Sequence, residues 1–455
     1  MRTRYRRGWA AAAILSAGMV FGGMFRDGEV VCFLGDSITN RGQYQNTVWD
    51  YYLTRFPGWT IRFVHAGRSG DSAGGSLGRL QEDVIDHKPT SVAIMMGMND
   101  VGRGNYVANP DEKRKAAQQR SLDGYKANMQ KLTERILREA NRPQLFLITP
   151  SPFDQTVVLD RDNNQPGCND GLGRCAAIVR ELAPKVNATV VDFHGPMTAF
   201  NLEQQKKDPK YTIVGPDRVH PGMPGHLMMA WLFLKTQGVP SLVSHVAVDA
   251  AAARVVAGEN AEVTAVARRD GGVSFTVLAK ALPFPADPAA CKALEGLLPI
   301  LEDLNRETLQ VTGLAAGEYA LAIDGKEAGR YPAAALAAGI SLGTNALTPQ
   351  YQQALNVSRL NARRRDAEGQ ARNLLNTRRW MQNHHKINVD DPAAVQAHYD
   401  GMQDKRQYGA VMALNYIKKW PQYETYRKDA AALEKEMLAS RTPVPHVYEV
   451  RPAGR

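Results

Sequence analysis

Three residues of this 455-residue chain have the types and spacing needed for nucleophilic chemistry. Ser37 follows the apolar run 30–35, which has the length and β-branched content of a buried strand. Asp217 and His220 lie three positions apart, far downstream. A serine hydroxyl is a weak nucleophile at neutral pH, and it needs a nearby base that is itself held by a carboxylate. The Asp-x-x-His spacing lets a turn bring the carboxylate to one ring nitrogen and leaves the other for Ser37, although such a pair alone is more often an ordinary surface loop.

Two further turns offer donors for an oxyanion. Gly70 follows the second apolar run, and a glycine there lets a backbone N–H approach a bound ester closely. Asn99 follows the third run, and its side-chain amide is a second possible donor. Each turn alone has the composition of an ordinary loop, so the assignment of donors depends on whether the fold brings the two turns together.

The order of the predicted elements does bring them together. Strand-like runs alternate with helix-like segments from residue 25 to about 240, which is typical of βαβ units and a parallel sheet covered on both faces. Right-handed crossovers then place all the carboxyl ends of the strands along one edge, where the four loops meet. The expected strands are 29–35, 60–67, 91–97, 144–150 and 188–193, and the expected helices are 44–56, 75–86, 121–140, 172–185 and 223–236.

Beyond about residue 240 the sequence no longer alternates between strand-like and helix-like segments. Residues 262–266 and 273–277 flank an Asp-Gly-Gly turn and predict a hairpin, and further short strands follow. Beyond residue 349 the chain is polar and helical, with Trp380 and Trp420 among the charges. We therefore predict an α/β domain over 24–240, a β-rich module over 241–345 and a C-terminal helical region over 346–455. Those tryptophans either fill a helical core or stack on sugars.

The start of the chain and its cysteines bear on the compartment. An arginine-rich opening is followed by an uncharged, alanine-rich stretch, so residues 1–23 are expected to be a signal peptide or an N-terminal anchor of an exported, periplasmic or extracellular protein. Cys168 and Cys175 either form a local disulfide or stay free. Cys32 is expected to be a small buried hydrophobe, and no Cys/His spacing is typical of a zinc site.

The net charge of +10 sets few limits on the function. The 56 basic residues are spread among 46 acidic ones without an aromatic-interleaved basic stripe, which argues against nucleic-acid binding. We expect no cofactor and no metal, and no membrane span after removal of the signal. The oligomeric state stays open.

The motifs together resemble those of the SGNH (GDSL-type) hydrolases, over roughly residues 25–240. The matching blocks are Gly35-Asp36-Ser37, Gly70, Gly97-x-Asn99-Asp100 and Asp217-x-x-His220. The resemblance implies a three-layer, flavodoxin-like α/β/α sandwich with a mostly parallel sheet. It also implies that Ser37 is the nucleophile, His220 the base and then acid, and Asp217 the residue that orients His220.

The same resemblance implies an oxyanion hole made by the backbone N–H groups of Ser37 and Gly70 and the side chain of Asn99. Asp36 is expected to brace the nucleophile loop. His65 departs from the pattern, because many members carry asparagine there.

The expected function is hydrolysis of small acyl esters, notably acetyl esters on carbohydrate, through an acyl-enzyme. The stretch 35–39 is similar to that of carbohydrate acetylesterases. The alternatives are a lipase, lysophospholipase or thioesterase of the same family, and a catalytically idle glycan-binding protein. The natural ester and the task of residues 241–455 are not determined by the sequence.

Overall fold

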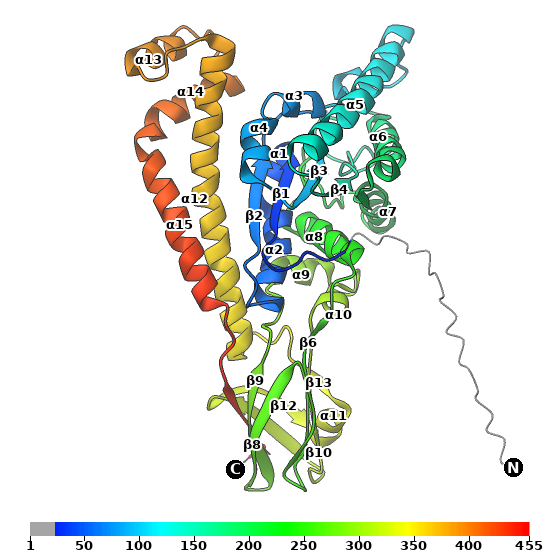
Figure 1. Cartoon of the computed structure of the whole chain (residues 1–455). Helices are drawn as coiled ribbons and strands as arrows, with labels where there is room; N and C mark the ends of the chain where they lie inside the picture. The colour runs from blue at the N-terminus through cyan, green and yellow to red at the C-terminus, as the bar shows by residue number, and fades with distance from the viewer. Residues whose placement is uncertain (1–22, 455) are drawn as a thin grey trace, which may run out of the picture.

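The computed structural model describes residues 23–454 and has three parts (Figure 1): an α/β domain, a β module below it and a helical region beside both. The predicted signal segment therefore lies almost wholly outside the described residues. The α/β domain is built on one parallel sheet with the strand order β2-β1-β3-β4-β5. Its strands are β1 (Val30–Gly35), β2 (Arg62–Gly67), β3 (Ser91–Met95), β4 (Gln144–Ile148) and β5 (Thr189–Val191).

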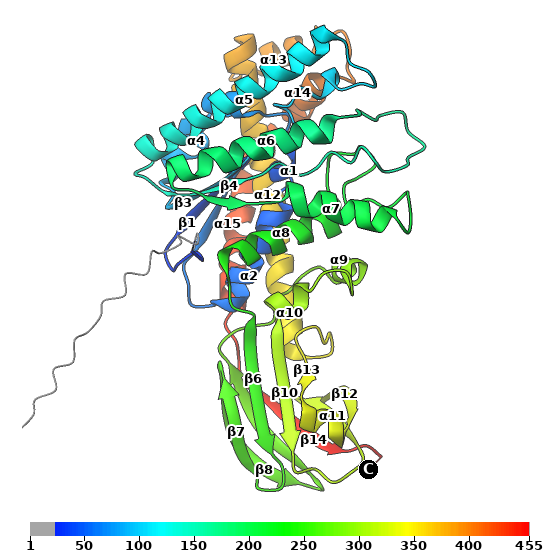
Figure 2. The same ribbon diagram turned by 90° about the vertical axis from the view of Figure 1, so that its right-hand side faces the viewer.

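Helices cover both faces of this sheet (Figure 2), so the α/β sandwich expected from the sequence is confirmed. The side chains of β1 alternate: Phe33 joins the core under α2 and α8, and Cys32 joins the core under α5 and α6. Strands buried on both faces are continuously apolar for this reason. The helices are α1 (Ser37–Asn40), α2 (Gln43–Arg55), α3 (Ala73–Leu77), α4 (Leu80–Asp83), α5 (Glu112–Glu139), α6 (Cys168–Leu182), α7 (His194–Gln205) and α8 (Met223–Gln237), with 3₁₀ turns at Ile85–His87, Arg103–Asn105 and Ala183–Val186.

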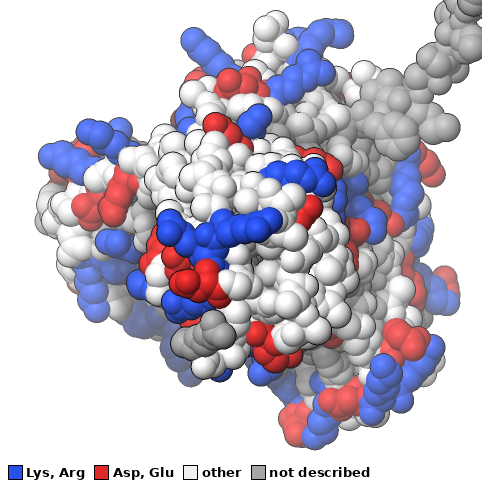
Figure 3. Space-filling model, turned by 90° about the horizontal axis from the view of Figure 1, so that it is seen from below, with Lys and Arg blue, Asp and Glu red and all other residues white. Residues whose placement is uncertain are grey.

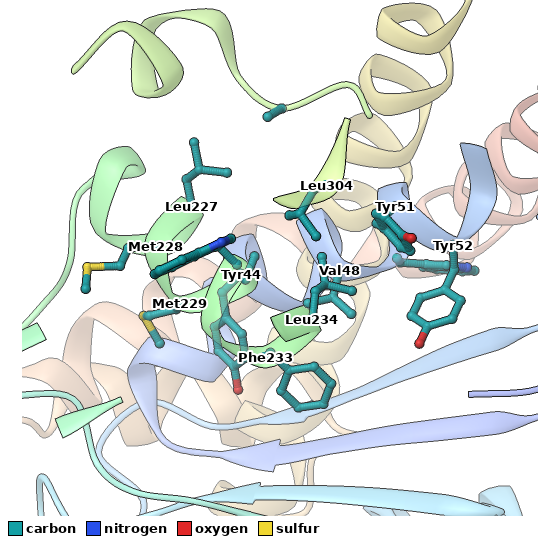
Figure 4. Close-up of a cluster of buried hydrophobic side chains, with 14 of the residues drawn as sticks. Tyr44, Val48, Tyr51, Tyr52, Leu227, Met228, Met229, Phe233, Leu234 and Leu304 are labelled. Carbon is teal, nitrogen blue, oxygen red and sulfur yellow. The ribbon is translucent and has the colours of Figure 1, made fainter. Parts of the chain in front are cut away.

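Aromatic side chains fill the core between α2 and α8 (Figure 4). Tyr44 and Val48 project from α2 toward Phe233 and Leu234 of α8, and the ring of Tyr51 lies against Phe284, with centroids 5.9 Å apart. Large aromatic side chains contribute much of the apolar area that a core removes from water. This core positions α8, which begins three residues after His220.

The predicted helix over 75–86 is instead two short helices, α3 and α4. The break falls at Gly78 and Arg79, and the buried Arg79 guanidinium donates to the carbonyls of Gly35 and Ala66. Glycines also lower the helix propensity of this segment.

The β module packs two sheets face to face around a shared core. Their strand orders are β13-β10-β6-β7 and β12-β11-β14-β9-β8. The predicted hairpin is β8–β9, and its two turn residues, Asp270 and Gly271, both have positive φ, as a two-residue hairpin loop requires. The strands are β6 (Leu242–Asp249), β7 (Arg254–Glu259), β8 (Ala261–Arg269), β9 (Gly272–Ala279), β10 (Arg306–Thr312), β11 (Glu318–Ile323), β12 (Lys326–Pro332), β13 (Ile340–Ser341) and β14 (His446–Pro452), with helices α9 (Pro288–Leu294), α10 (Ile300–Leu304) and α11 (Ala333–Ala338).

The helical region is dominated by α12 (Pro349–His385), which runs beside α15 (Tyr423–Ser440) along the α/β domain (Figure 1). The shorter helices α13 (Pro392–Asp400) and α14 (Tyr408–Lys419) and a 3₁₀ turn at Trp420–Gln422 lie between them in sequence. Trp420 stacks between Tyr416 and Tyr423, with ring centroids 4.9 and 4.8 Å away, so it belongs to the helical core. The chain then returns to the β module, where β14 pairs with β9 and β11.

Helix α12 covers the open edge of the parallel sheet. Arg372 donates to the carbonyl oxygen of His65 on edge strand β2, at 3.1 Å. Ser358 and Asn361 each donate to the Asp50 carboxylate of α2, at 2.7 Å. An uncovered edge strand is a template for wrong pairing, and a helix laid along it removes that hazard.

Cys168 and Cys175 are both buried, free thiols, so the disulfide alternative is not realised. Both lie on α6, seven residues apart, which corresponds to a rise of about 10 Å and exceeds the Cα separation that a disulfide tolerates. Cys32 is a fully buried member of the sheet core, as expected.

Within residues 23–454 no helix has the length and apolar character that crossing a membrane requires. In the same range no group of three or more His, Cys, Asp or Glu side chains is arranged to hold a metal ion. On the face seen from below, basic and acidic side chains are interspersed (Figure 3).

Candidate active site

Ser37 lies at the carboxyl edge of the parallel sheet, directly after β1. It is the first residue of α1, and the Asp36 side chain caps that helix by accepting the N–H of Ile38 at 2.9 Å. Glycine is required at position 35, because a Cβ there would lie 2.1 Å from the Thr39 hydroxyl. The end of β1, the Asp36 cap and the close approach of Thr39 to Gly35 together fix the orientation of the Ser37 side chain.

The structure brings the three distant residues into one line. Ser37 Oγ lies 2.7 Å from His220 Nε2, and His220 Nδ1 lies 2.6 Å from Asp217 Oδ2. The second carboxylate oxygen of Asp217 accepts the N–H groups of Val219 at 3.1 Å and His220 at 3.0 Å. All four of these contacts are within hydrogen-bonding distance. The side chain of His220 is 24% exposed, so the line is open to a substrate.

The hydrogen bonds of Asp217 keep it ionised. Partial burial alone would raise its pKa, but hydrogen bonds from the backbone and ring of His220 and the backbone of Val219 outweigh that and lower the pKa. A carboxylate that stays negative favours the imidazole tautomer with hydrogen on Nδ1 and leaves Nε2 as an acceptor for the serine proton.

The loop that carries this pair is held by a residue that the sequence did not single out. Arg218 has φ +65°, in the left-handed region, and its backbone N–H donates to the carbonyl of Gly215. Its guanidinium is buried and donates to the carbonyls of Asp154 and Val157, at 2.9 and 2.8 Å. An arginine between Asp217 and Val219 resembles a surface residue in the sequence, and no local signal distinguishes it.

The two candidate donor loops are tied to each other. Asn99 Nδ2 donates to the Asp71 carbonyl at 2.8 Å, and the N–H of Ala73 donates to the Asp100 carboxylate at 2.9 Å. Gly70 has φ +76°, which favours glycine. An asparagine amide has two hydrogens, so one remains for a ligand while the other holds the loop.

Buried ion pairs of Arg79 hold these loops in place. Arg79 pairs with Asp71 at 2.6 Å and with Asp83 at 2.8 Å. Burial, with a smaller contribution from the nearby Asp100 and Asp71, raises the pKa of Asp36 to about 7. Burial likewise raises the pKa of Asp100 to about 6. The nucleophile turn therefore rests on a carboxyl that is protonated over part of the neutral pH range.

His65, the departure from the family pattern, contacts the helical region. It is buried, and its Nε2 lies 3.4 Å from an Arg364 guanidinium nitrogen of α12. Burial, helped by the neighbouring arginines, lowers its pKa to about 3, so it is neutral. Its role is to pack the sheet edge against α12.

Comparisons with known proteins identify the domain that carries these residues. Residues 33–228 match the model of the GDSL-like lipase/acylhydrolase family. An acetylxylan esterase of Geobacillus stearothermophilus is 29% identical over 229 residues, which is 46% of this chain and 94% of that protein. The solved structure of a gut microbial diltiazem-metabolizing enzyme is 30% identical with a TM-score of 0.85, covering 94% of this chain and 99% of that one.

The family model covers the α/β domain, and the match to the solved structure extends over the β module and the helical region as well. The three-part architecture is therefore shared with a solved relative, and the sheet edge at Ser37 is part of a recognised hydrolase domain. The chain belongs to the GDSL-like lipase/acylhydrolase family and is an ester hydrolase.

Proposed function

We propose that this protein removes small acyl groups, chiefly acetyl, from esters of carbohydrates through an acyl-enzyme. The observation that carries the proposal is the hydrogen-bonded line from Ser37 through His220 to Asp217, with contacts of 2.7 and 2.6 Å. The likeness to an acetylxylan esterase supports the acetyl group and the carbohydrate.

In the proposed reaction, His220 Nε2 takes the proton of Ser37 as Oγ attacks the ester carbonyl carbon. The negative charge that develops on the carbonyl oxygen is accepted by the N–H groups of Ser37 and Gly70 and the amide of Asn99. His220 then protonates the leaving alcohol, and the acyl group stays on Ser37. In the second half, His220 takes a proton from water, which attacks the acyl-enzyme and releases the acid.

Asp217 acts through His220 in this scheme. Its ionised carboxylate fixes the ring and stabilises the imidazolium that forms in each half-reaction. The backbone hydrogen bonds to its second oxygen hold the carboxylate still, so little reorganisation is needed when the charge appears.

The test compares acyl chain lengths. Purified protein is expected to cleave p-nitrophenyl acetate with a far higher kcat/KM than p-nitrophenyl octanoate, and Ser37→Ala should abolish both activities. Ser341→Ala, an exposed serine of the β module, serves as the matched control and should retain both. Equal or greater activity on the octanoate would reject the acetyl preference and favour the lipase or thioesterase alternative.

A fluorophosphonate probe examines the nucleophile directly. A covalent adduct is expected on Ser37 in the wild type and not in Ser37→Ala. A folded wild-type sample that forms no adduct at Ser37 would contradict the assigned nucleophile.

The arginine-rich start followed by an uncharged stretch leads us to propose export to the periplasm or the exterior. Fractionation of producing cells, followed by N-terminal sequencing of the mature protein, tests this. Recovery of the uncut chain in the cytoplasm would contradict it.

A further inference from the structure

A cleft lined by both polar and apolar side chains lies between the helical region and the loops around Ser37. It has a volume of about 510 Å³, within the range usual for ligand sites. One wall is Asn40, Arg68 and Ser69 of the α/β domain, and the other is formed by α12 and α14. Figure 1 shows α14 at the end of α12 that lies beside α3 and α4.

The cleft begins close to the nucleophile. Asn40 is the last residue of α1, and Ser37 is the first, so the two Cβ atoms lie one helical turn apart, at about 5–6 Å. A second cleft of about 370 Å³ continues from the first: the two share Arg68, Ser69, Asn376 and Trp380, and the second also includes Gly70. A ligand that extends along both clefts would therefore lie one helical turn from Ser37 and against Gly70.

The chemistry of the lining selects a neutral, hydroxyl-rich ligand. The polar groups of the helical wall are chiefly the amides of Asn373, Asn376 and Asn415, and the lining of the first cleft contains no carboxylate and one cation, Arg68 of the opposite wall. In the second cleft the carboxylates of Asp71 and Glu82 are paired with Arg79 and Arg379. Within residues 23–454 the amides of the three asparagines form no hydrogen bond with another side chain or with the backbone. An amide both donates and accepts, as a sugar hydroxyl does.

Two aromatic side chains complete the wall. Trp380 lines both clefts, and Tyr408, which is 61% exposed, lines the first. Trp420 differs from Trp380, because two tyrosines cover the faces of its ring. An aromatic ring that borders such a cleft offers an apolar face for the C–H side of a sugar ring.

We propose that the α12–α14 wall is a subsite for a neutral oligosaccharide on the alcohol side of the ester, with Asn376, Trp380 and Tyr408 as its specificity residues. This inference rests on the proposed function for the chemistry at Ser37, and it adds the part of the chain that holds the glycan. The helical region would thus select long carbohydrate esters over small ones.

The test separates binding from catalysis. Binding of unacetylated xylohexaose to Ser37→Ala is measured by calorimetry, alone and combined with Asn376→Ala or Tyr408→Ala. Loss of one neutral hydrogen bond is expected to weaken binding about fivefold, and loss of the aromatic face by a similar or larger factor. Tyr426→Ala, on α15, is the control and should bind as Ser37→Ala alone does.

Kinetics give the second readout. In the wild-type background, Asn376→Ala and Tyr408→Ala should raise KM for acetylated xylohexaose and leave kcat/KM for p-nitrophenyl acetate unchanged. Trp380→Ala is added with a melting curve, since that ring is partly buried against the helical core. A rise of KM for p-nitrophenyl octanoate alone would assign the cleft to an acyl chain and overturn the proposal.

The outcomes distinguish the two proposals. If the wild type hydrolyses aryl acetates and not acetylated sugars, the proposed function is rejected. In that case the subsite proposal still stands if the cleft variants lose the binding of xylohexaose. If acetylated sugars are hydrolysed and neither binding nor KM changes in the variants, the subsite is rejected and the function stands.

Discussion

The buried carboxyl of Asp36 makes the stability of the nucleophile turn depend on pH. Its side chain is 2% exposed and accepts the N–H of Ile38 at 2.9 Å. Burial, with a smaller contribution from the neighbouring Asp100 and Asp71, raises its pKa from 3.8 to about 7. Asp36→Asn removes the charge and keeps an oxygen that can accept the same N–H, and asparagine is as good a helix N-cap as aspartate.

The size of the effect follows from the pKa change. The rise of the Asp36 pKa from 3.8 to about 7 corresponds to ~4 kcal/mol between the two protonation states. The folded pKa is above the unfolded one, so the folded protein holds the proton more tightly between pH 3.8 and about 7. The stabilisation is fully present below the unfolded pKa and is lost as pH rises through the folded pKa.

The Asp36→Asn variant lacks the carboxyl proton that the wild type loses as pH rises. Relative to the wild type, Asp36→Asn should therefore gain ~2–3 kcal/mol in the free energy of unfolding as pH rises from about 5 to about 8.5. Melting temperatures of both proteins across this range, followed by circular dichroism, measure the difference. Asp429→Asn removes a carboxylate from the exposed face of α15 and serves as the control, with a difference that should stay flat.

The comparison between variants is needed because other buried acids also titrate. Burial raises the pKa of Glu307 to about 7 and that of Asp50 to about 6, so the wild-type profile alone mixes several groups. Subtracting the variant leaves the contribution of Asp36. A difference that is independent of pH, or one that shrinks as pH rises, would refute the assignment of a buried, neutral Asp36.

Two further predictions concern the donor loop and the helix that covers the sheet edge. Asn99→Ala removes one proposed oxyanion donor and should lower kcat for p-nitrophenyl acetate by ~10²–10³. The lost hydrogen bond to the Asp71 carbonyl should lower the melting temperature by only a few degrees, and a loss of kcat below tenfold in steady-state kinetics would remove Asn99 from the oxyanion hole. Arg372→Met deletes the hydrogen bonds to the His65 carbonyl and to Asn40, and should lower the free energy of unfolding by about 2 kcal/mol in a denaturant titration. Arg359→Met, an exposed arginine of the same helix, is the matched control, and equal effects of the two substitutions would show that the Arg372 contacts contribute nothing specific.

The α/β domain was largely predictable because its signals are local. Continuous apolar runs marked five parallel strands, and the motifs after them carried the family resemblance. The turn at Asp270 and Gly271 likewise marked its hairpin. The predicted boundaries at 240 and 345 stay predictions, and so do the roles of Ser37, His220 and Asp217.

The contacts between distant segments were not predictable from the sequence. The strand β14 lies more than a hundred residues from β11, its partner, and nothing in His446–Pro452 indicates which sheet it joins. Arg79 and Arg218 have the composition of surface residues, and only the fold shows that their guanidinium groups meet buried carbonyls. Both are buried charges whose partners come from other elements, and a single sequence cannot reveal such pairings.

The position of the proposed glycan wall is set by packing at the sheet edge. Arg372 joins α12 to strand β2 and to the end of α1, and Asn376 and Trp380 follow one and two turns later on the same helix. A continuous helix transmits a shift at Arg372 directly to those side chains, because its backbone hydrogen bonds fix their spacing. Weakening the edge contact should therefore change the preference between short and long carbohydrate esters, although no residue of the cleft wall or of the catalytic line has been replaced.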